Sequence, residues 1–332
     1  MFLLSGALLL IVSISAAAGI GAVQVPLPVV WEVVADRLLP GAAGGTWPAG
    51  QEAIVWNIRL PRALLACLVG AGLGVVGVAL QAVTRNPLAD PHLLGISSGG
   101  AFGAILALLH TGLFLGSLTV PLLSFLGALG ATAIVLLVSR LAAAMTATRL
   151  VLAGVAVSFA IMSCANALIF LGDPRAAHTA IYWMLGGLGL AQWSHLPVPL
   201  IGLVACTALF MVKSAELNAL TLGDETASTL GIQVPRFRLT VFVAGALLTG
   251  IMVAYSGIIG FVGLMIPHIA RMLVGGDSAR VIPASALAGA IFLLWADILA
   301  RSIAAPEDMP IGIVTGLVGG VFFVWLLGRR QT

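Results

Sequence analysis

The sequence predicts an all-α, polytopic integral membrane protein with about ten transmembrane helices and both termini in the cytoplasm. Only 8% of its 332 residues are charged and 61% are apolar, whereas a soluble domain carries about 25% charged residues. The mean hydropathy is +1.16, and disordered chains are polar and rich in charge rather than apolar. Because a helical span needs roughly 20 residues, a chain of this length holds roughly ten spans joined by short loops.

Proline, glycine and charged residues separate the apolar runs of the first half. No lysine or arginine precedes the N-terminal run, so we interpret it as a retained first span rather than a secretory signal. Residues 25–57 are expected to form a periplasmic loop that contains a short surface helix at about 29–39. The first five spans are expected at about 2–24, 59–83, 92–110, 118–139 and 149–171.

The second half follows the same pattern around one polar interruption. Residues 214–238 are the most polar stretch of the chain, and within 215–232 we expect two short helices divided by Gly223. The remaining spans are expected at about 196–213, 239–255, 258–274, 281–301 and 310–328. The whole chain, 1–332, is thus interpreted as a single transmembrane domain.

The basic residues near the span ends predict the orientation. With ten spans, ten lysines and arginines fall on the side of the termini and five on the other side. Cytoplasmic loops carry the excess of basic residues. We therefore expect both termini and the 214–238 loop in the cytoplasm.

Small residues and helix breakers suggest close packing and a path through the molecule. Glycines recur at i+4, as in Gly70 and Gly74, and such faces let helices approach closely. The repeat across 312–320 has the alternative interpretation of a subunit interface. Breaks at 85–88, 257–260 and 265–267 are tolerated at membrane depth only where protein or a water-filled cavity covers the backbone.

The side-chain chemistry favours neither an enzyme nor a nucleic-acid binder. The only lysine, Lys213, follows a valine, so no phosphate-binding loop of the form GxxxxGK[ST] exists. Gly95 to Gly99 matches GxSxG, but a helical span in place of a strand removes the context that a nucleophile elbow needs. The histidines and cysteines show no metal-ligand spacing, and no run of basic residues suggests nucleic acid. We expect no catalytic residue, metal or cofactor in this chain.

Asp297 is the one acidic residue that we place inside a span. A carboxylate within the bilayer is costly and normally has a partner. Arg301 follows at i+4, the spacing that puts both side chains on one helix face. The sequence therefore predicts a local ion pair, and the lack of further acids along the spans argues against a proton-driven carrier.

Four motifs in order resemble a known family. They are RLPR (59–62) with the glycine-rich stretch 70–104 that contains RNPLADPHLLGISSGG, LNALTLGDETASTLGI (217–232), the run 257–301 that begins GIIGFVGLMIPHIAR, and the run 309–327 that begins MPIGIVTGLVGG. Together they are similar to the permease subunits of bacterial ABC importers for iron chelates and cobalamin. The resemblance implies a homodimer in the inner membrane, two separate ATPase subunits that bind ATP and Mg, and a periplasmic binding protein that delivers the solute.

The resemblance also assigns roles to residues at matching positions. Arg59, Arg62 and Arg301 match periplasmic arginines that receive acidic residues of the binding protein, with interfacial anchoring as the alternative. The coupling helices that contact the ATPase would present Leu222, Gly223, Asp224, Ala227, Leu230 and Gly231. The cytoplasmic gate would contain Asn86, Leu88 and Thr148.

The resemblance also bears on the solute. General likeness to haem-importer permeases favours haem, moved by alternating access, with ferric siderophores and cobalamin as alternatives from the same family. Phe159, Met162 and Met252 are suited to line an apolar path or, equally, to pack in the core. A secondary carrier and an intramembrane enzyme that uses Ser97 are the alternatives from other classes.

Overall fold

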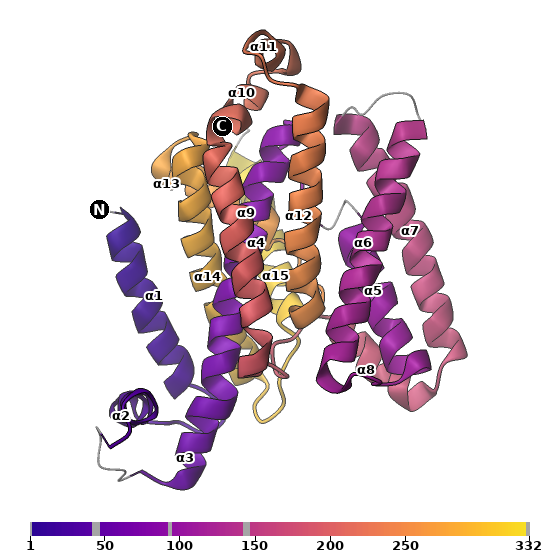
Figure 1. The fold of residues 1–332 in the computed structure, drawn as a ribbon. Coiled ribbons are helices and arrows are strands. Elements are labelled where there is room, and N and C mark those ends of the chain that lie inside the picture. The colour runs from indigo at the N-terminus through magenta and orange to yellow at the C-terminus, as the bar shows by residue number, and fades with distance from the viewer. Residues whose placement is uncertain (1, 42–46, 92–94, 142–146, 330–332) are drawn as a thin grey trace.

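The computed structural model describes residues 2–41, 47–91, 95–141 and 147–329, and every regular element in these ranges is helical (Figure 1). Each expected span contains one helix. These helices are α1 (Phe2–Gly19), α4 (Leu60–Thr84), α5 (Ile96–Leu106), α6 (Thr119–Leu141), α7 (Ala147–Leu171), α9 (Pro197–Val212), α12 (Val234–Ser256), α13 (Val262–Val274), α14 (Ser278–Ile303) and α15 (Ile311–Arg329). Seven helical stretches of the described residues are long and apolar enough to cross a membrane, and three shorter apolar ones complete the set.

Shorter helices connect the long ones. They are α2 (Leu27–Leu38), α3 (Ala49–Ala53), α8 (Pro174–Met184), α10 (Ser214–Thr221) and α11 (Asp224–Thr229). The expected surface helix is confirmed as α2, and Gly223 separates α10 from α11 as predicted. The loop expected at 25–57 is shorter than predicted, because α3 and a π-helical turn at 54–59 run continuously into α4.

The break expected at 257–260 is present, but the one expected around Pro267 is not. Residues 257–260 are not helical, whereas Pro267 lies inside α13. Proline leaves the carbonyl four residues earlier without its helical donor. The side-chain amide of Gln81 on α4 donates to that carbonyl, Gly263 O, at 3.3 Å, and to Leu264 O at 3.1 Å. A neighbouring helix thus supplies the missing bond and α13 continues.

Helix α4 forms the centre of the fold. All of its residues except Leu64 and Leu68 are buried, and it packs against α1, α9, α12, α13 and α14. The approach to α14 is closest at Gly70 and Gly289, where a Cβ on either residue would overlap the other's carbonyl. A second group, α5 to α7, lies beside this core and contacts it mainly through α12 (Figure 1).

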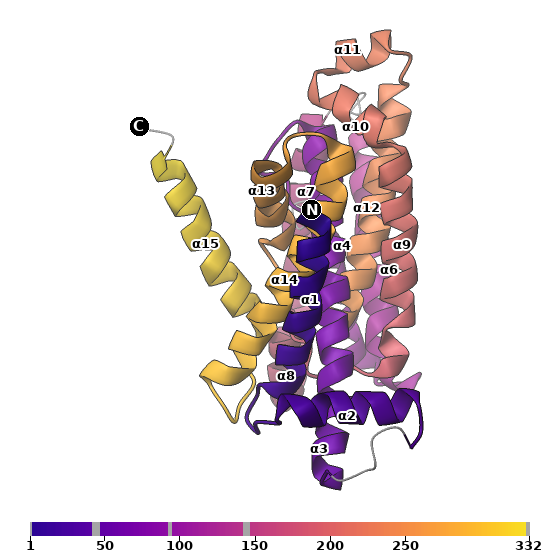
Figure 2. The same ribbon diagram turned by 90° about the vertical axis from the view of Figure 1, so that its left-hand side faces the viewer.

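The two ends of the bundle differ. Helices α10 and α11 cover one end, and α2 and α3 lie at the other, with both ends of the described chain directed toward the α10–α11 end (Figures 1 and 2). Helix α15 leans away from the bundle along its C-terminal half (Figure 2). Its outward face carries exposed apolar side chains such as Leu317 and Val324.

The contact between α5 and α6 depends on glycine and gives a first testable prediction. A Cβ at Gly127 would overlap the Gly99 carbonyl, whereas a Cβ at Gly130, one turn further on α6, meets nothing within 4 Å. Forced overpacking costs about 1–3 kcal/mol. We therefore expect Gly127→Ala to lower the thermal unfolding midpoint in detergent and Gly130→Ala to leave it unchanged or raise it. Equal midpoints for the two variants would contradict this packing.

Candidate functional site

Helices α10 and α11 present an apolar surface at one end of the molecule. Leu217 and Leu220 on α10 are fully buried against the bundle. In contrast, Leu222 and Leu230 are 72% and 65% exposed. Between them Gly223 has φ +126°, a conformation that favours glycine, and it turns the chain from α10 into α11. The arrangement leaves two leucines free to contact another protein.

Asp224, the first residue of α11, connects this surface to two long helices. Its carboxylate accepts two hydrogen bonds from Arg238 Nη2 on α12, at 3.0 and 3.1 Å. Arg85, at the end of α4, lies 3.5 Å away and forms a second ion pair. The buried Arg238 also donates from Nε to Val83 O on α4 at 3.2 Å. Asp224 therefore holds α11 to α4 and α12 together.

Asn218 connects α10 to α14. Its amide donates to Asp277 Oδ1 at 2.8 Å, and its carbonyl oxygen accepts from Ser278 N at 2.9 Å. Asp277 is the N-cap of α14 and also accepts from Ala279 N. The hydrogen bond from Asn218 lowers the pKa of Asp277 below its usual value. Asn218 and Asp277 thus cap the N-terminus of α14 together.

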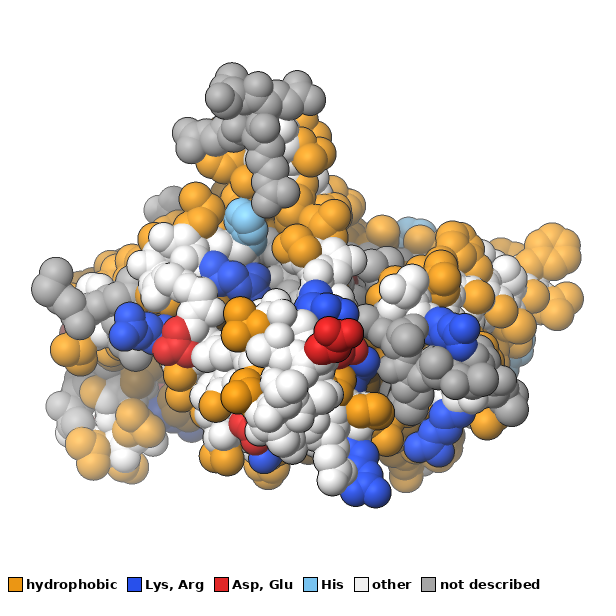
Figure 3. Space-filling model, turned by 90° about the horizontal axis from the view of Figure 1, so that it is seen from above, with side chains coloured by type: hydrophobic (Ala, Val, Ile, Leu, Met, Phe, Trp, Pro, Cys, Tyr) orange, Lys and Arg blue, Asp and Glu red, His pale blue; other side chains and the backbone are white. Residues whose placement is uncertain are grey.

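An open pocket of about 720 Å³ lies beside this surface, between α10 and the start of α12. Its lining includes Lys213, Glu216, Leu230 and Arg236. Lys213 donates to Glu216 at 2.7 Å, and this bond lowers the pKa of Glu216. Basic side chains are spread over this end of the molecule, as the view from above shows (Figure 3).

The predicted gate residues lie on two elements. Asn86 and Leu88 are in the turn after α4, where Asn86 Oδ1 accepts from Leu88 N at 2.9 Å and Leu88 is half exposed. Thr148 is exposed in the first turn of α7. Among the described residues no hydrogen bond joins Thr148 to the other two. His92, which belongs to the motif at 70–104, lies outside the described residues.

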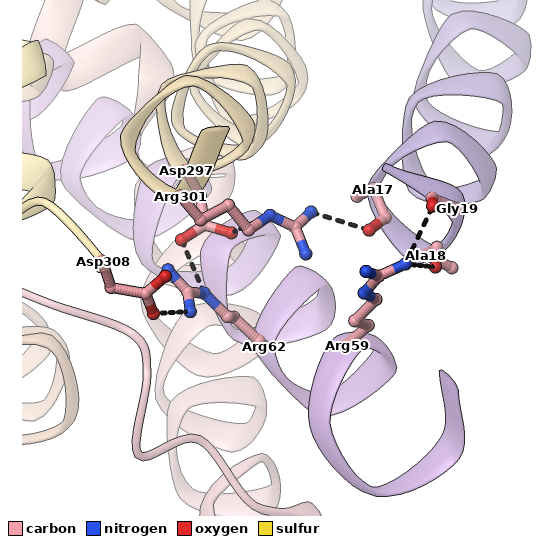
Figure 4. A network of polar contacts seen from close by, with 8 residues as sticks. All are labelled: Ala17, Ala18, Gly19, Arg59, Arg62, Asp297, Arg301 and Asp308. Atoms are coloured by element: carbon pink, nitrogen blue, oxygen red, sulfur yellow. Dashed lines mark hydrogen bonds and ion pairs between the residues drawn. The ribbon is translucent and has the colours of Figure 1, made fainter. Parts of the chain in front are cut away.

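The three predicted docking arginines gather toward the opposite end, in a buried network with two carboxylates (Figure 4). Arg62 on α4 donates from Nε to Asp297 on α14 at 2.8 Å and from Nη1 to Asp308, in the loop before α15. Arg301 lies 3.5 Å from the other oxygen of Asp297, so the predicted pair on α14 is confirmed. Asp297 is fully buried, whereas 49% of the Asp308 side chain is exposed.

The remaining contacts of this network are with the backbone of α1 and the residues that follow it. Arg301 donates to Ala17 O at 2.7 Å, and Arg59 donates to Ala18 O, Gly19 O and Val23 O. Arg59, Arg62 and Arg301 are each no more than 7% exposed. The arginines therefore bind α1, α4 and α14 to one another, and their charges do not form an open basic patch.

Sequence reasoning missed three participants in these networks, namely Asp308, Arg238 and Asn218. Asp308 is far from Arg62 along the chain, so no local spacing indicates that the two meet. In the sequence Arg238 is only one of several basic residues near span ends, and Asn218 lies without a distinguishing pattern inside the polar stretch. A buried acid requires a counter-charge, but Arg301 at i+4 already meets that requirement, so the sequence carries no signal that Arg62 is a second partner of Asp297.

Comparison with known proteins agrees with the motifs and the fold. The FecCD transport family matches residues 8–329. The chain is 41% identical to the ABC transporter permease protein YvrB of Bacillus subtilis, over 97% of this chain and 92% of that protein. It is 41% identical to the hemin transport system permease protein HmuU of Yersinia pestis, over 86% and 87% of the two chains. The Fe(3+) dicitrate permease protein FecC of Escherichia coli is 38% identical, over 92% and 90%.

A solved structure shares the whole architecture. It is described as an inward-facing conformation of a metal-chelate type ABC transporter, and it superimposes with a TM-score of 0.85 at 31% identity, covering 98% of both chains. The relatives are transport permeases rather than enzymes, and the apolar helices make this a multi-pass inner-membrane protein. The chain therefore belongs to the FecCD transport family, the permeases of type II ABC importers.

Proposed function

We propose that this chain is the permease of an ATP-driven importer that moves haem across the inner membrane by alternating access. In this proposal it works as a homodimer with two ATPase subunits and a periplasmic binding protein, and ATP and Mg bind to the ATPase alone. The α10–α11 end faces the cytoplasm and the α2 end the periplasm, in line with the excess of basic residues on the side of α10 and α11.

The observation that carries this proposal is the way α10 and α11 are built into the bundle. Leu222 and Leu230 form the exposed surface for the ATPase, with Gly231 beside them and the buried Ala227 beneath. When the ATPase moves α10 and α11, Asp224 transmits the movement to α4 and α12, and Asn218 transmits it to α14. A displacement of α10 and α11 is thus transmitted to three long helices, through the ion pairs of Asp224 and the two hydrogen bonds of Asn218. Rigid-body alternating access requires such connections.

The other proposed sites lie at the two ends of the solute path. Arg59, Arg62 and Arg301 receive carboxylates of the binding protein at the periplasmic side, which requires these buried side chains to exchange internal contacts when the two proteins dock. At the cytoplasmic side Asn86, Leu88 and Thr148 form the gate, for which the hydrogen-bonded turn at 86–88 supplies a defined geometry. The path itself lies between the two subunits of the dimer.

Haem is favoured over other chelates by the likeness to the hemin permease. Relatives that act on dicitrate-bound iron and vitamin B12 are only slightly less similar, so a siderophore or cobalamin permease is the alternative. Membership of an ABC permease family sets aside the secondary carrier. Of the apolar path residues, Met252 is fully buried and packs near Gly72 in the core, whereas Phe159 is 73% exposed. Of these two, we propose Phe159 as the residue that meets the solute.

The test is ATP-dependent uptake into proteoliposomes that contain the permease, its ATPase and its binding protein. We expect haem uptake that requires both partners. A ferric siderophore tested in parallel should not be taken up. Siderophore uptake without haem uptake would retain the importer mechanism and overturn the choice of substrate.

A further inference from the structure

We propose that the Asp308 carboxylate occupies Arg62 in the free permease and that a carboxylate of the binding protein replaces it when the two proteins dock. Asp308 is then an internal stand-in for the carboxylate of the partner. This inference rests on the proposed docking role of the arginines. It adds a residue that competes with the partner and so tunes the affinity of the complex.

The charges of the network leave one exchangeable position. Arg62 and Arg301 share Asp297, and Arg62 also binds Asp308 through a different nitrogen (Figure 4). Asp297 is fully buried between Arg62 and Arg301, so no outside group can replace it. Asp308 is half exposed, and its contact is the point where an outside carboxylate can reach Arg62 Nη1. Exchange of one carboxylate for another never leaves Arg62 buried without a counter-charge.

The Asp308 side chain can leave without unfolding its surroundings. The backbone around it is fixed by bonds that do not involve the carboxylate. Tyr182 Oη donates to Asp308 O at 3.2 Å, and Met309 N donates to Ala300 O at 3.2 Å. At the start of α15, Ile311 N donates to Gly186 O at 3.0 Å. Only a side-chain rotation is therefore needed to vacate Arg62.

Gly189 keeps the approach to this pair open. It is an exposed residue in the loop after α8, and a Cβ built on it would lie 3.4 Å from Asp308 Oδ2 and 3.7 Å from Arg62 Nη1. A side chain at this position would cover the ion pair without occupying it. Gly187, two residues earlier, is also exposed and a Cβ there meets nothing within 4 Å.

The first experiment measures the dissociation constant of the binding protein with the assembled transporter in nanodiscs. Asp308→Asn is compared with Glu307→Gln, because both remove one negative charge from the same exposed turn but only the former frees Arg62. We expect Asp308→Asn to strengthen binding about three- to fivefold, the scale of a partly exposed ion pair, and Glu307→Gln to change it less than about twofold. Equal effects of the two variants, or no gain with Asp308→Asn, would overturn the proposal.

A double variant separates this proposal from the docking role itself. Arg62→Gln should weaken binding, and adding Asp308→Asn to it should then have no further effect. If Arg62→Gln leaves binding unchanged, the docking role of Arg62 fails. If Arg62→Gln weakens binding and Asp308→Asn alone does nothing, only the stand-in role fails. A thermal melt of each variant establishes that it is folded.

Gly189 provides a test that leaves every charge in place. We expect Gly189→Val to weaken binding at least about fivefold by covering Arg62, and Gly187→Val to have little effect. Unchanged binding by Gly189→Val would show that the partner does not approach over this loop and would contradict the exchange at Asp308.

Discussion

Replacement of Asp297 by asparagine is expected to destabilise the permease more than any other single substitution in the arginine network. The carboxylate is fully buried and lies 2.8 Å from Arg62 and 3.5 Å from Arg301. Asparagine keeps the size and the hydrogen-bond acceptor but removes the negative charge. Arg301 is buried, and among the described residues its only carboxylate partner is Asp297. In the variant it therefore keeps its hydrogen bond to the Ala17 carbonyl but has no carboxylate partner. Loss of one partner of a buried ion pair costs about 3–5 kcal/mol.

The measurement is the thermal unfolding midpoint of the purified permease in detergent, together with the yield of folded protein from membranes. Asp308→Asn is the matched control, since it removes the other carboxylate from the same arginine but at a half-exposed position. We expect a large fall in midpoint or yield for Asp297→Asn and a small one for Asp308→Asn. Similar midpoints for the two variants would show that Asp297 is not the counter-charge that holds α4 to α14.

The order of the helices was predictable because apolar composition and helix breakers are local properties. Each of the ten apolar runs contains one helix, and Gly223 marks the boundary between α10 and α11. Helix α8 was not anticipated, although a signal was present. Asp173 caps it by accepting from Arg175 N at 2.7 Å, and Pro174 occupies its first position. Aspartate followed by proline is a typical helix start.

The site was predictable only in part, because its contacts join distant segments. The ion pair on α14 followed from i+4 spacing, whereas the shorter contact of Asp297 with Arg62 depends on the packing of α4 against α14. The same packing buries the arginines that the resemblance assigns to docking. Likewise, Pro267 reads as a break in sequence, and only the fold shows that Gln81 compensates for it.

Replacement of Asp224 by arginine is expected to lower ATP-driven uptake at least about tenfold while the complex with the ATPase still forms. Asp224 is the acidic residue that holds α11 to Arg238 and Arg85. An arginine in its place would bring three cations together and separate α11 from α4 and α12, since like charges at this distance repel. The exposed leucines that we propose as the ATPase contact are unaltered, so we expect binding to be retained while the movement is no longer transmitted.

Uptake into proteoliposomes and ATP hydrolysis by the same complexes are to be measured together. Glu225→Arg is the control, because it makes the same charge change one residue further on, at an exposed position. Asp224→Glu should restore much of the uptake by returning the carboxylate. If Asp224→Arg hydrolyses ATP without uptake while Glu225→Arg keeps both, the loss lies in the connection between α11 and the bundle. Preserved uptake in Asp224→Arg would show that α11 drives the long helices by another route, leaving Asn218 and the packing of α10 to carry the movement.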